Sequence, residues 1–146
     1  MMRHIRRLTP DDCPAFETLR RAYSAEMSEG EGEDSRGGFA AALLSHPNVL
    51  CWGAFMEGEL VAFAVVFHLP EAISGGWCGL LDDLYVAPAR RRRGLARNLL
   101  ETVFRHGQQQ EWTHLRWLVP ETDAPAIALY ERMADEAPWR SFMIYF

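Results

Sequence analysis

A strand, a basic glycine loop and a helix follow one another in the middle of the chain, and this junction constrains the fold most. Before the loop, the apolar side chains of residues 80–86 form a run that ends at Ala87-Pro88, as expected of a buried strand stopped by a proline. After the loop, leucine, valine and phenylalanine side chains recur at helical spacing from Leu95 to Phe104. The positive end of that helix, its unpaired N–H groups and the arginines of residues 90–93 all meet at the loop. The stretch therefore predicts a site for a phosphate-bearing ligand.

A run of arginines also occurs on solvated faces and in general polyanion patches, so the order of residues matters more than the charge. No Gly-Lys-Ser/Thr follows the glycine, and only one glycine stands where the dinucleotide loop needs three. The pattern that fits is Arg/Gln-x-x-Gly-x-Gly/Ala, which Arg91, Gly94 and Ala96 fill after a strand ending in Tyr85-Val-Ala-Pro. In this order the chain resembles the GNAT superfamily of acyl-CoA-dependent N-acyltransferases.

This resemblance implies that the loop holds the pyrophosphate of acetyl-CoA as co-substrate. The coenzyme-binding residues that it implies are Leu84, Tyr85, Val86, Arg91, Arg92, Arg93, Gly94, Leu95, Ala96, Arg97 and Asp123. Main-chain groups of residues 84–86 would bind the pantetheine arm, with the Val86 N–H as oxyanion donor. The family usually has Asn where Asp123 stands, and a carboxylate lacks the amide's donor, so this coenzyme contact is expected to be weaker.

Within the superfamily the chain is most similar to polyamine and thialysine acetyltransferases, through Leu81-Asp-Asp-Leu-Tyr-Val and Ala128-Leu-Tyr-Glu-Arg. Asp82 then resembles the catalytic carboxylate, acting as a base through water or as the anchor of a substrate ammonium. Tyr130 resembles the general acid toward the coenzyme thiolate. Neighbours on a strand face opposite sides, so Asp82 and Asp83 cannot both face one site, and Asp83 is assigned to substrate binding. Trp77 is either a wall of the substrate side or a core residue.

Periodicity and turn residues outline the remaining elements. Expected strands cover residues 4–8, 49–56, 60–69, 77–86, 114–119 and 141–146; expected helices begin near Pro10, Phe39, Leu95 and Asp123, the last as an N-cap. Between the first two helices, residues 26–36 form an acidic stretch, either a solvated connection or a lid that attracts cations. The predicted fold class is α+β, a GNAT-type mixed and mostly antiparallel sheet flanked by helices, with one strand-helix-strand crossover that carries the basic loop.

Composition limits the classes of function. A length of 146 residues with 49% hydrophobic side chains predicts one domain over residues 1–146, and a net charge of -5 argues against a nucleic-acid partner. Cys13, Cys51 and Cys78 are odd in number and lack a Cys-x-x-Cys pair, which indicates a reducing compartment without disulfides. Scattered histidines predict no metal site. With no apolar run near twenty residues, we expect a cytoplasmic protein without a membrane partner. A homodimer is a possible assembly that the sequence does not decide.

Acetyl transfer to an amine requires a base, because an alkylammonium has a pKa near that of lysine, about 10.4. It also requires an acid for the departing thiolate and a donor for the carbonyl oxygen. The leading hypothesis is therefore an acetyl-CoA-dependent N-acetyltransferase for a small cationic amine, working by direct attack in a ternary complex. A protein or peptide N-acetyltransferase and a non-catalytic acyl-CoA sensor are the alternatives.

Overall fold

A five-stranded sheet organises the computed structural model, which describes residues 2–28 and 38–146. Its described strands are β1 (Arg3–Arg7), β2 (Val49–Met56), β3 (Glu59–Glu71), β4 (Gly76–Val86) and β5 (Leu115–Arg116), in the spatial order β1-β2-β3-β4-β5. β1 to β4 pair antiparallel, whereas β5 lies parallel to β4. The described helices are α1 (Cys13–Met27), α2 (Phe39–Ser45), α3 (Leu95–Gln109) and α4 (Ala124–Met133), with short 3-10 turns at Pro10–Asp12 and Pro88–Arg90. The predicted α+β class and its single crossover are confirmed.

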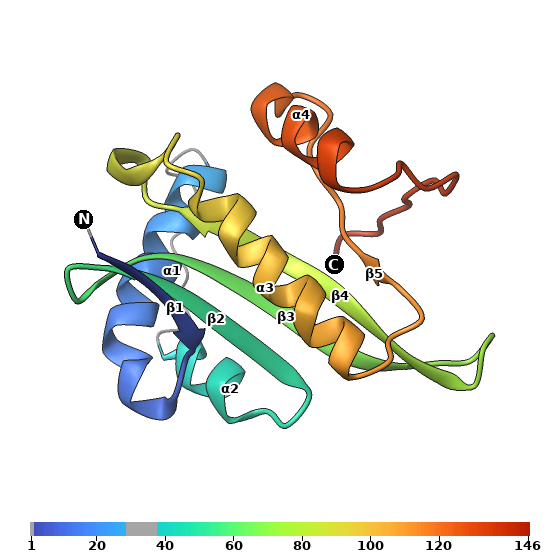
Figure 1. The fold of residues 1–146 in the computed structure, drawn as a ribbon, viewed down its shortest axis with the longest axis horizontal. Coiled ribbons are helices and arrows are strands. Elements are labelled where there is room, and N and C mark those ends of the chain that lie inside the picture. Colours follow the sequence, from blue (N-terminus) through green and yellow to red (C-terminus); the bar gives the residue numbers. More distant parts are fainter. Residues whose placement is uncertain (1, 29–37) are drawn as a thin grey trace.

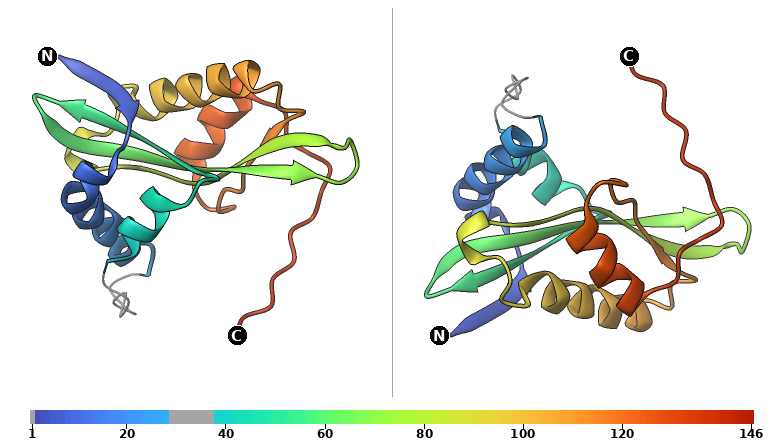
Figure 2. Two further views of the ribbon diagram at one scale, coloured as in Figure 1. Left: turned by 90° about the horizontal axis from the view of Figure 1, so that it is seen from below. Right: turned by 90° about the horizontal axis from the view of Figure 1, so that it is seen from above.

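Helices cover both faces of this sheet (Figures 1 and 2), with α1 and α2 on one side and α3 and α4 on the other. On the first side, the fully buried Phe16 of α1 packs edge-on against Phe63 of β3 at 5.2 Å between ring centroids. On the second side, Leu99, Leu100 and Val103 of α3 are fully buried against the sheet. Burial of one such side chain stabilises a fold by about 1.5–3 kcal/mol. The packed helices on the two faces therefore hold the loops at their ends in place.

A β-bulge interrupts β4 in its middle. Val65 of β3 pairs with Asp83 and the next residue, Val66, pairs with Leu81, so Asp82 is the extra residue. A bulge bends its strand and increases the local twist. β5 pairs with β4 only at Gly79 and Leu80, before the bulge, and the chain after β5 then separates from β4. The predicted strand over residues 114–119 is thereby shortened to two residues.

One predicted element is wrong. Residues 141–146 form no strand, because no neighbouring strand pairs with them, and they are exposed. Glu26 also differs from expectation, since it lies in the last turn of α1 and not in a loop. The rest of the acidic stretch, residues 29–36, lies outside the described residues. No helix within residues 2–28 and 38–146 has both the length and the apolar character needed to cross a bilayer.

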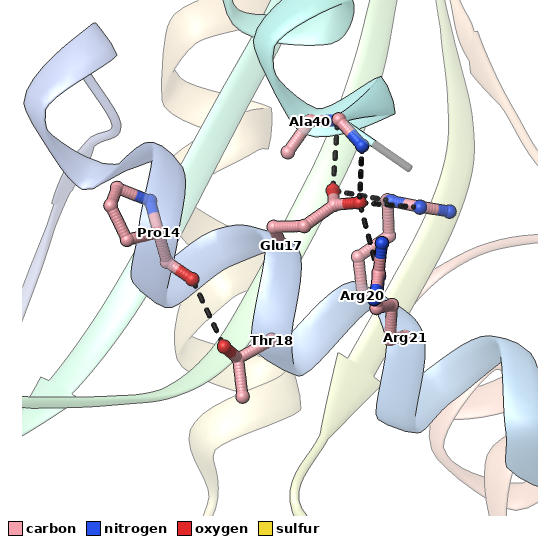
Figure 3. A network of polar contacts seen from close by, with 7 residues as sticks. Pro14, Glu17, Thr18, Arg20, Arg21 and Ala40 are labelled. Carbon is pink, nitrogen blue, oxygen red and sulfur yellow. Dashed lines mark hydrogen bonds and ion pairs between the residues drawn. The ribbon is translucent and has the colours of Figure 1, made fainter. Parts of the chain in front are cut away.

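Glu17 of α1 joins the two helices on the first face of the sheet (Figure 3). Its carboxylate accepts hydrogen bonds from the backbone N–H groups of Gly38 (3.1 Å) and Ala40 (2.9 Å) at the start of α2. Arg20 donates two further bonds to the same carboxylate, and these contacts hold the pKa of Glu17 down at about 2. An ionised carboxylate here satisfies N–H groups that the first turn of a helix leaves unpaired, so it fixes α2 against α1.

Candidate active site

A pocket opens where β4 and the chain after β5 separate. Its walls are residues 81–84 around the bulge and residues 117–120 after β5, with Asp123 at the N-cap of α4 and Ala126 and Tyr130 within that helix. Tyr23 and Met27, near the end of α1, complete the lining. Bulges are common beside functional sites because they redirect side chains, and here the bulge brings both aspartates of β4 to one pocket.

Asp83 is the more enclosed of these two aspartates. The hydroxyl of Tyr23 donates a short hydrogen bond to its carboxylate, and its side chain is partly buried. Burial raises the pKa of Asp83 to about 7, with a further upward contribution from Asp82, while the Tyr23 bond acts in the opposite direction. Asp82 is exposed at the pocket wall. The two neighbouring carboxyl groups therefore sit in different environments, a pattern that separates the roles of paired acids in many active sites.

Tyr130 faces the same pocket from α4. Its ring packs edge-on against Trp117 at 5.4 Å between centroids, which fixes the direction of its hydroxyl. Burial, and secondly the charge of Asp123, raises the pKa of Tyr130, so the phenol is protonated at neutral pH. The Asp123 carboxylate accepts a hydrogen bond from the Ala126 N–H at 3.2 Å, and the predicted N-cap of α4 is confirmed.

The basic loop has the backbone expected of an anion site. Gly94 stands at the N-cap of α3 with φ of 77°, and no side chain caps the N–H groups of the first turn, residues 95–97, which include Ala96 and Arg97. Such N–H groups and the helix dipole favour a phosphate. Space around Gly94 is open, because a Cβ built there would meet only Nη1 of Arg3, 3.7 Å away. Arg3 comes from β1 and adds a cation that sequence reasoning missed.

Arg91, the first residue of the expected loop pattern, contacts the end of β4 and the end of α1. Its Nε donates to the Val86 carbonyl at 2.9 Å, and its Nη2 donates to both carboxylate oxygens of Glu26 at 2.8 and 3.0 Å. The hydroxyl of Tyr85 also donates to Glu26, at 2.8 Å. Arg92 and Arg93 are exposed on the loop. Arg91 thus ties the loop to the end of α1, while the following two arginines face solvent.

Past the bulge, the outer edge of β4 offers main-chain groups to a ligand. The N–H of Ala87 donates across to the Val61 carbonyl at 2.9 Å. Because donors alternate along an antiparallel ladder, the N–H groups of Leu84 and Val86 point to the opposite edge. Within the described residues, β5 pairs with β4 only as far as Leu80, so this stretch of edge is unpaired. An extended amide-bearing chain can add to it as a strand would.

Trp77 lies away from the pocket. Its ring stacks on His68 at 4.4 Å between centroids, with an interplanar angle of 5°, near the end of the β3–β4 hairpin. His68 in turn accepts a hydrogen bond from the indole of Trp112 at 2.8 Å. Trp77 is 44% exposed, so it is not the core residue that the alternative interpretation expected. No group of three or more histidine, cysteine or acidic side chains placed to hold a metal occurs among residues 2–28 and 38–146.

Tyr23 is a pocket residue that sequence reasoning missed. Its spacing with Phe16 and Leu19 indicated only the apolar face of a helix. Its partner Asp83 is sixty residues further along the chain, so no local pattern reveals their contact.

Comparisons with known proteins agree with the fold. The sequence model described as the acetyltransferase (GNAT) family matches residues 14–134. A ribosomal-protein-alanine N-acetyltransferase from Brucella melitensis biovar Abortus 2308 has 27% identity and a TM-score of 0.87, with all of both chains covered. An aminoglycoside acetyltransferase, HMB0005, from an uncultured soil metagenomic sample has 26% identity and a TM-score of 0.83, covering 100% of this chain and 99% of its own.

A third solved structure, the aminoglycoside N-acetyltransferase AAC(6')-Iy in complex with CoA, shares the fold at a TM-score of 0.80 with 17% identity, over 99% of this chain and 95% of its own. No curated protein matches the sequence. The match over residues 14–134 shows that the chain belongs to the GNAT acetyltransferase family. Its activity is accordingly acetyl-CoA-dependent N-acetyl transfer.

Proposed function

We propose that this enzyme acetylates a primary amine of a small cationic molecule by direct attack on the thioester of acetyl-CoA. The observation that carries the proposal is the meeting of Asp83, Asp82 and Tyr130 in one pocket, beside the unpaired edge of β4. Direct attack needs no nucleophile from the enzyme, so the rate comes from alignment, proton transfer and charge stabilisation.

Asp83 is the better candidate for the base, although sequence reasoning favoured Asp82. A base works best when its pKa lies near the operating pH. Burial raises the pKa of Asp83 to about 7, which is in that range. Asp83 would accept the proton of the substrate ammonium, while Tyr23 holds its carboxylate in place through their hydrogen bond. The exposed Asp82 fits the other role considered for it, the anchor of a substrate ammonium.

Tyr130 would protonate the departing thiolate, since its phenol is protonated at neutral pH and lies in the same pocket. The Val86 N–H, on the unpaired edge, would donate to the carbonyl oxygen as charge develops. Bound acetyl-CoA supplies the activated acyl group as a thioester. For the coenzyme itself, the first turn of α3 with Arg92 and Arg93 would hold the pyrophosphate, and residues 84–86 the pantetheine arm.

Charge supports a cationic acceptor. Asp82, Asp83 and Asp123 all line the pocket, whereas the arginines lie at the loop. A polyamine, a diamino acid or an aminoglycoside would place a second ammonium near the carboxylate that does not take the proton. The similarity to an aminoglycoside acetyltransferase favours this class.

A peptide amine is the second candidate, favoured by the 27% identity to a ribosomal-protein-alanine N-acetyltransferase over the whole chain. An α-amino group has a pKa of about 7.7–8.0, so it would need less help from a base.

A panel of amines separates the two candidates. Release of thiol from acetyl-CoA is measured with diamines, aminoglycosides, neutral and acidic amines, and peptides with an N-terminal alanine. The proposal predicts the highest kcat/KM for amines that carry a second positive charge, and an advantage that shrinks with salt because the Debye length falls from about 10 Å at 0.1 M to about 3 Å at 1 M. A preference for the peptides, or for acidic or aromatic amines, would overturn it.

A further inference from the structure

Glu26, in the last turn of α1, holds the guanidinium of Arg91. In Figure 1 the loop after β4, drawn in yellow, lies beside this end of α1. Both oxygens of the Glu26 carboxylate accept from Nη2 of Arg91, and one of them also accepts from the hydroxyl of Tyr85. The side chains of Arg91 and Glu26 are 44% and 42% exposed. Ion pairs as exposed as this one are weak, so an anion of higher charge can replace the carboxylate.

The guanidinium of Arg91 lies on the edge of β4 that the coenzyme would use. Its Nε donates to the Val86 carbonyl at 2.9 Å. In an antiparallel ladder a residue turns its N–H and its carbonyl to the same edge, and Ala87 already bonds across to β3. The Val86 carbonyl therefore lies on the outer edge, which has no partner strand there within residues 2–28 and 38–146. Arg91 thus occupies an acceptor that an amide of the pantetheine arm would need.

Glu26 also lies beside the acceptor pocket. Tyr23, three residues earlier on α1, and Met27, the next residue, both line that pocket. Residues three apart are neighbours on one face of a helix. The ring of Tyr85, whose hydroxyl bonds to Glu26, is 5.1 Å from the ring of Tyr23 between centroids. A carboxylate released from Arg91 would therefore remain next to the site proposed for a cationic amine.

We propose that Glu26 exchanges partners: a phosphate of acetyl-CoA takes the guanidinium of Arg91, and the released carboxylate binds the second ammonium of a cationic acceptor. A phosphate offers a guanidinium the same two-oxygen contact as a carboxylate. The released carboxylate is then a negative charge near the coenzyme phosphates, and an ammonium beside it neutralises that charge. Coenzyme and acceptor therefore favour each other's binding, by the same factor. The first step rests on the basic loop as the proposed coenzyme site, and the second on the proposed class of acceptor.

Glu26→Gln tests the first step through the sign of its effect. The amide keeps the shape of the side chain but not the charge that competes with phosphate for Arg91. CoA should therefore bind roughly two- to fivefold more tightly in calorimetry, which is the range expected of an exposed ion pair. Glu59→Gln is the matched control, because Glu59 pairs with Arg90 of the same loop at 3.7 Å, and this variant should bind CoA as the wild type does. Unchanged or weaker affinity in Glu26→Gln would mean that the pair persists in the complex, and the exchange would be wrong.

A carboxyl ¹³C NMR titration of the unaltered enzyme tests the exchange without any substitution. Hydrogen bonds from Arg91 first, and from Tyr85 second, hold the pKa of Glu26 below its ordinary value. In the CoA complex Glu26 would lose Arg91 and lie near phosphates, so its pKa should rise, while that of Glu17 near the other end of α1 should stay at about 2. A Glu26 pKa that stays low in the complex refutes the exchange.

A diamine and a monoamine of equal length test the second step. Glu26→Gln should raise KM for the diamine, leave KM for the monoamine unchanged, and leave kcat unchanged for both, because Glu26 only binds the second ammonium. A saturating diamine should tighten CoA binding in the wild type and not in Glu26→Gln. An unchanged KM for the diamine would remove Glu26 from the acceptor site.

Failures of the underlying assignments are recognised separately. CoA binding that survives in Gly94→Glu would refute the basic loop as the coenzyme site, whatever Glu26 does. A preference for peptides in the amine panel would refute the acceptor class, and the effect of Glu26→Gln on CoA affinity would still decide the first step.

Discussion

Replacing Asp83 with Asn tests the proposed base most directly. The amide keeps the shape of the side chain and can still meet the Tyr23 hydroxyl, but it cannot take a proton at neutral pH. General-base catalysis contributes about 10²- to 10⁴-fold, so turnover should fall by that factor with little change in coenzyme affinity.

The pH dependence sharpens this test. With a pKa of about 7, Asp83 is ionised to about one part in a hundred at pH 5 and about nine parts in ten at pH 8, so kcat should rise roughly 90-fold between them. For an aspartate of ordinary pKa, about 3.9, the ionised fraction would change by less than about a tenth between pH 5 and pH 8. The substrate should be a diamine with pKa values near about 10.4, because it stays protonated throughout.

Asp82→Asn is the matched control, since it removes the neighbouring carboxylate and leaves Asp83 in place. We expect this variant to weaken amine binding and to keep the rise of kcat with pH. Stopped assays of thiol release from pH 5 to 8, at saturating substrates, give both profiles. If the rise survives in Asp83→Asn and disappears in Asp82→Asn, the two roles are assigned the wrong way round; if it survives in both, neither aspartate is the base.

Four further perturbations probe the surrounding residues. Tyr23→Phe removes a hydrogen bond that lowers the pKa of Asp83, so the acidic limb of kcat should move to higher pH, and an unmoved limb would contradict that contact. Tyr130→Phe should lower kcat by about 10²- to 10⁴-fold while calorimetry shows unchanged CoA affinity; full activity would remove the acid role. Gly94→Glu should abolish CoA binding, whereas Gly94→Ala, with the same backbone cost of about 1–2 kcal/mol at positive φ but no charge, should still bind; equal affinities would refute the loop assignment. Glu17→Gln should lower the free energy of unfolding in urea by about 1.5–3 kcal/mol. Because the folded pKa of Glu17 is depressed to about 2, that difference should be present above about pH 4.5 and vanish as pH falls toward 2; a difference independent of pH would exclude the carboxylate as its origin.

The sequence predicted those parts of the fold that depend on local pattern. The helix expected to begin near Leu95 begins there in the structure, because its apolar spacing and the glycine before it are both local signals. The Asp123 cap was predictable for the same reason. The short length of β5 was not predictable, since it depends on where β4 bends. The absence of a strand over residues 141–146 was not predictable either, because an apolar segment looks like a strand whether or not an edge lies beside it.

The chemistry of the site depended on contacts that no short window contains. Asp83 and Asp82 are neighbours in sequence and both aspartates, yet only Asp83 meets the hydroxyl of Tyr23 and is partly buried. Likewise, the arginine run predicted a phosphate loop but not that Arg91 would bind Glu26 of α1. That ion pair joins the basic loop to the helix that carries Tyr23.

The bulge at Asp82 connects the fold of β4 to the proposed chemistry. In a regular strand Leu81 and Tyr85 would face the same side, but Leu81 packs with the α3 layer and Tyr85 with the α1 layer. Because of the extra residue, Leu81 points into the core on the α3 side of the sheet. Asp83, two residues later, points instead to the α1 side, where it meets Tyr23. The same bend ends the pairing with β5 at Leu80, which frees the N–H groups of Leu84 and Val86. A single irregularity in one strand thus turns Asp83, the proposed base, toward Tyr23, borders the pocket and leaves the outer edge of β4 unpaired beyond Leu80.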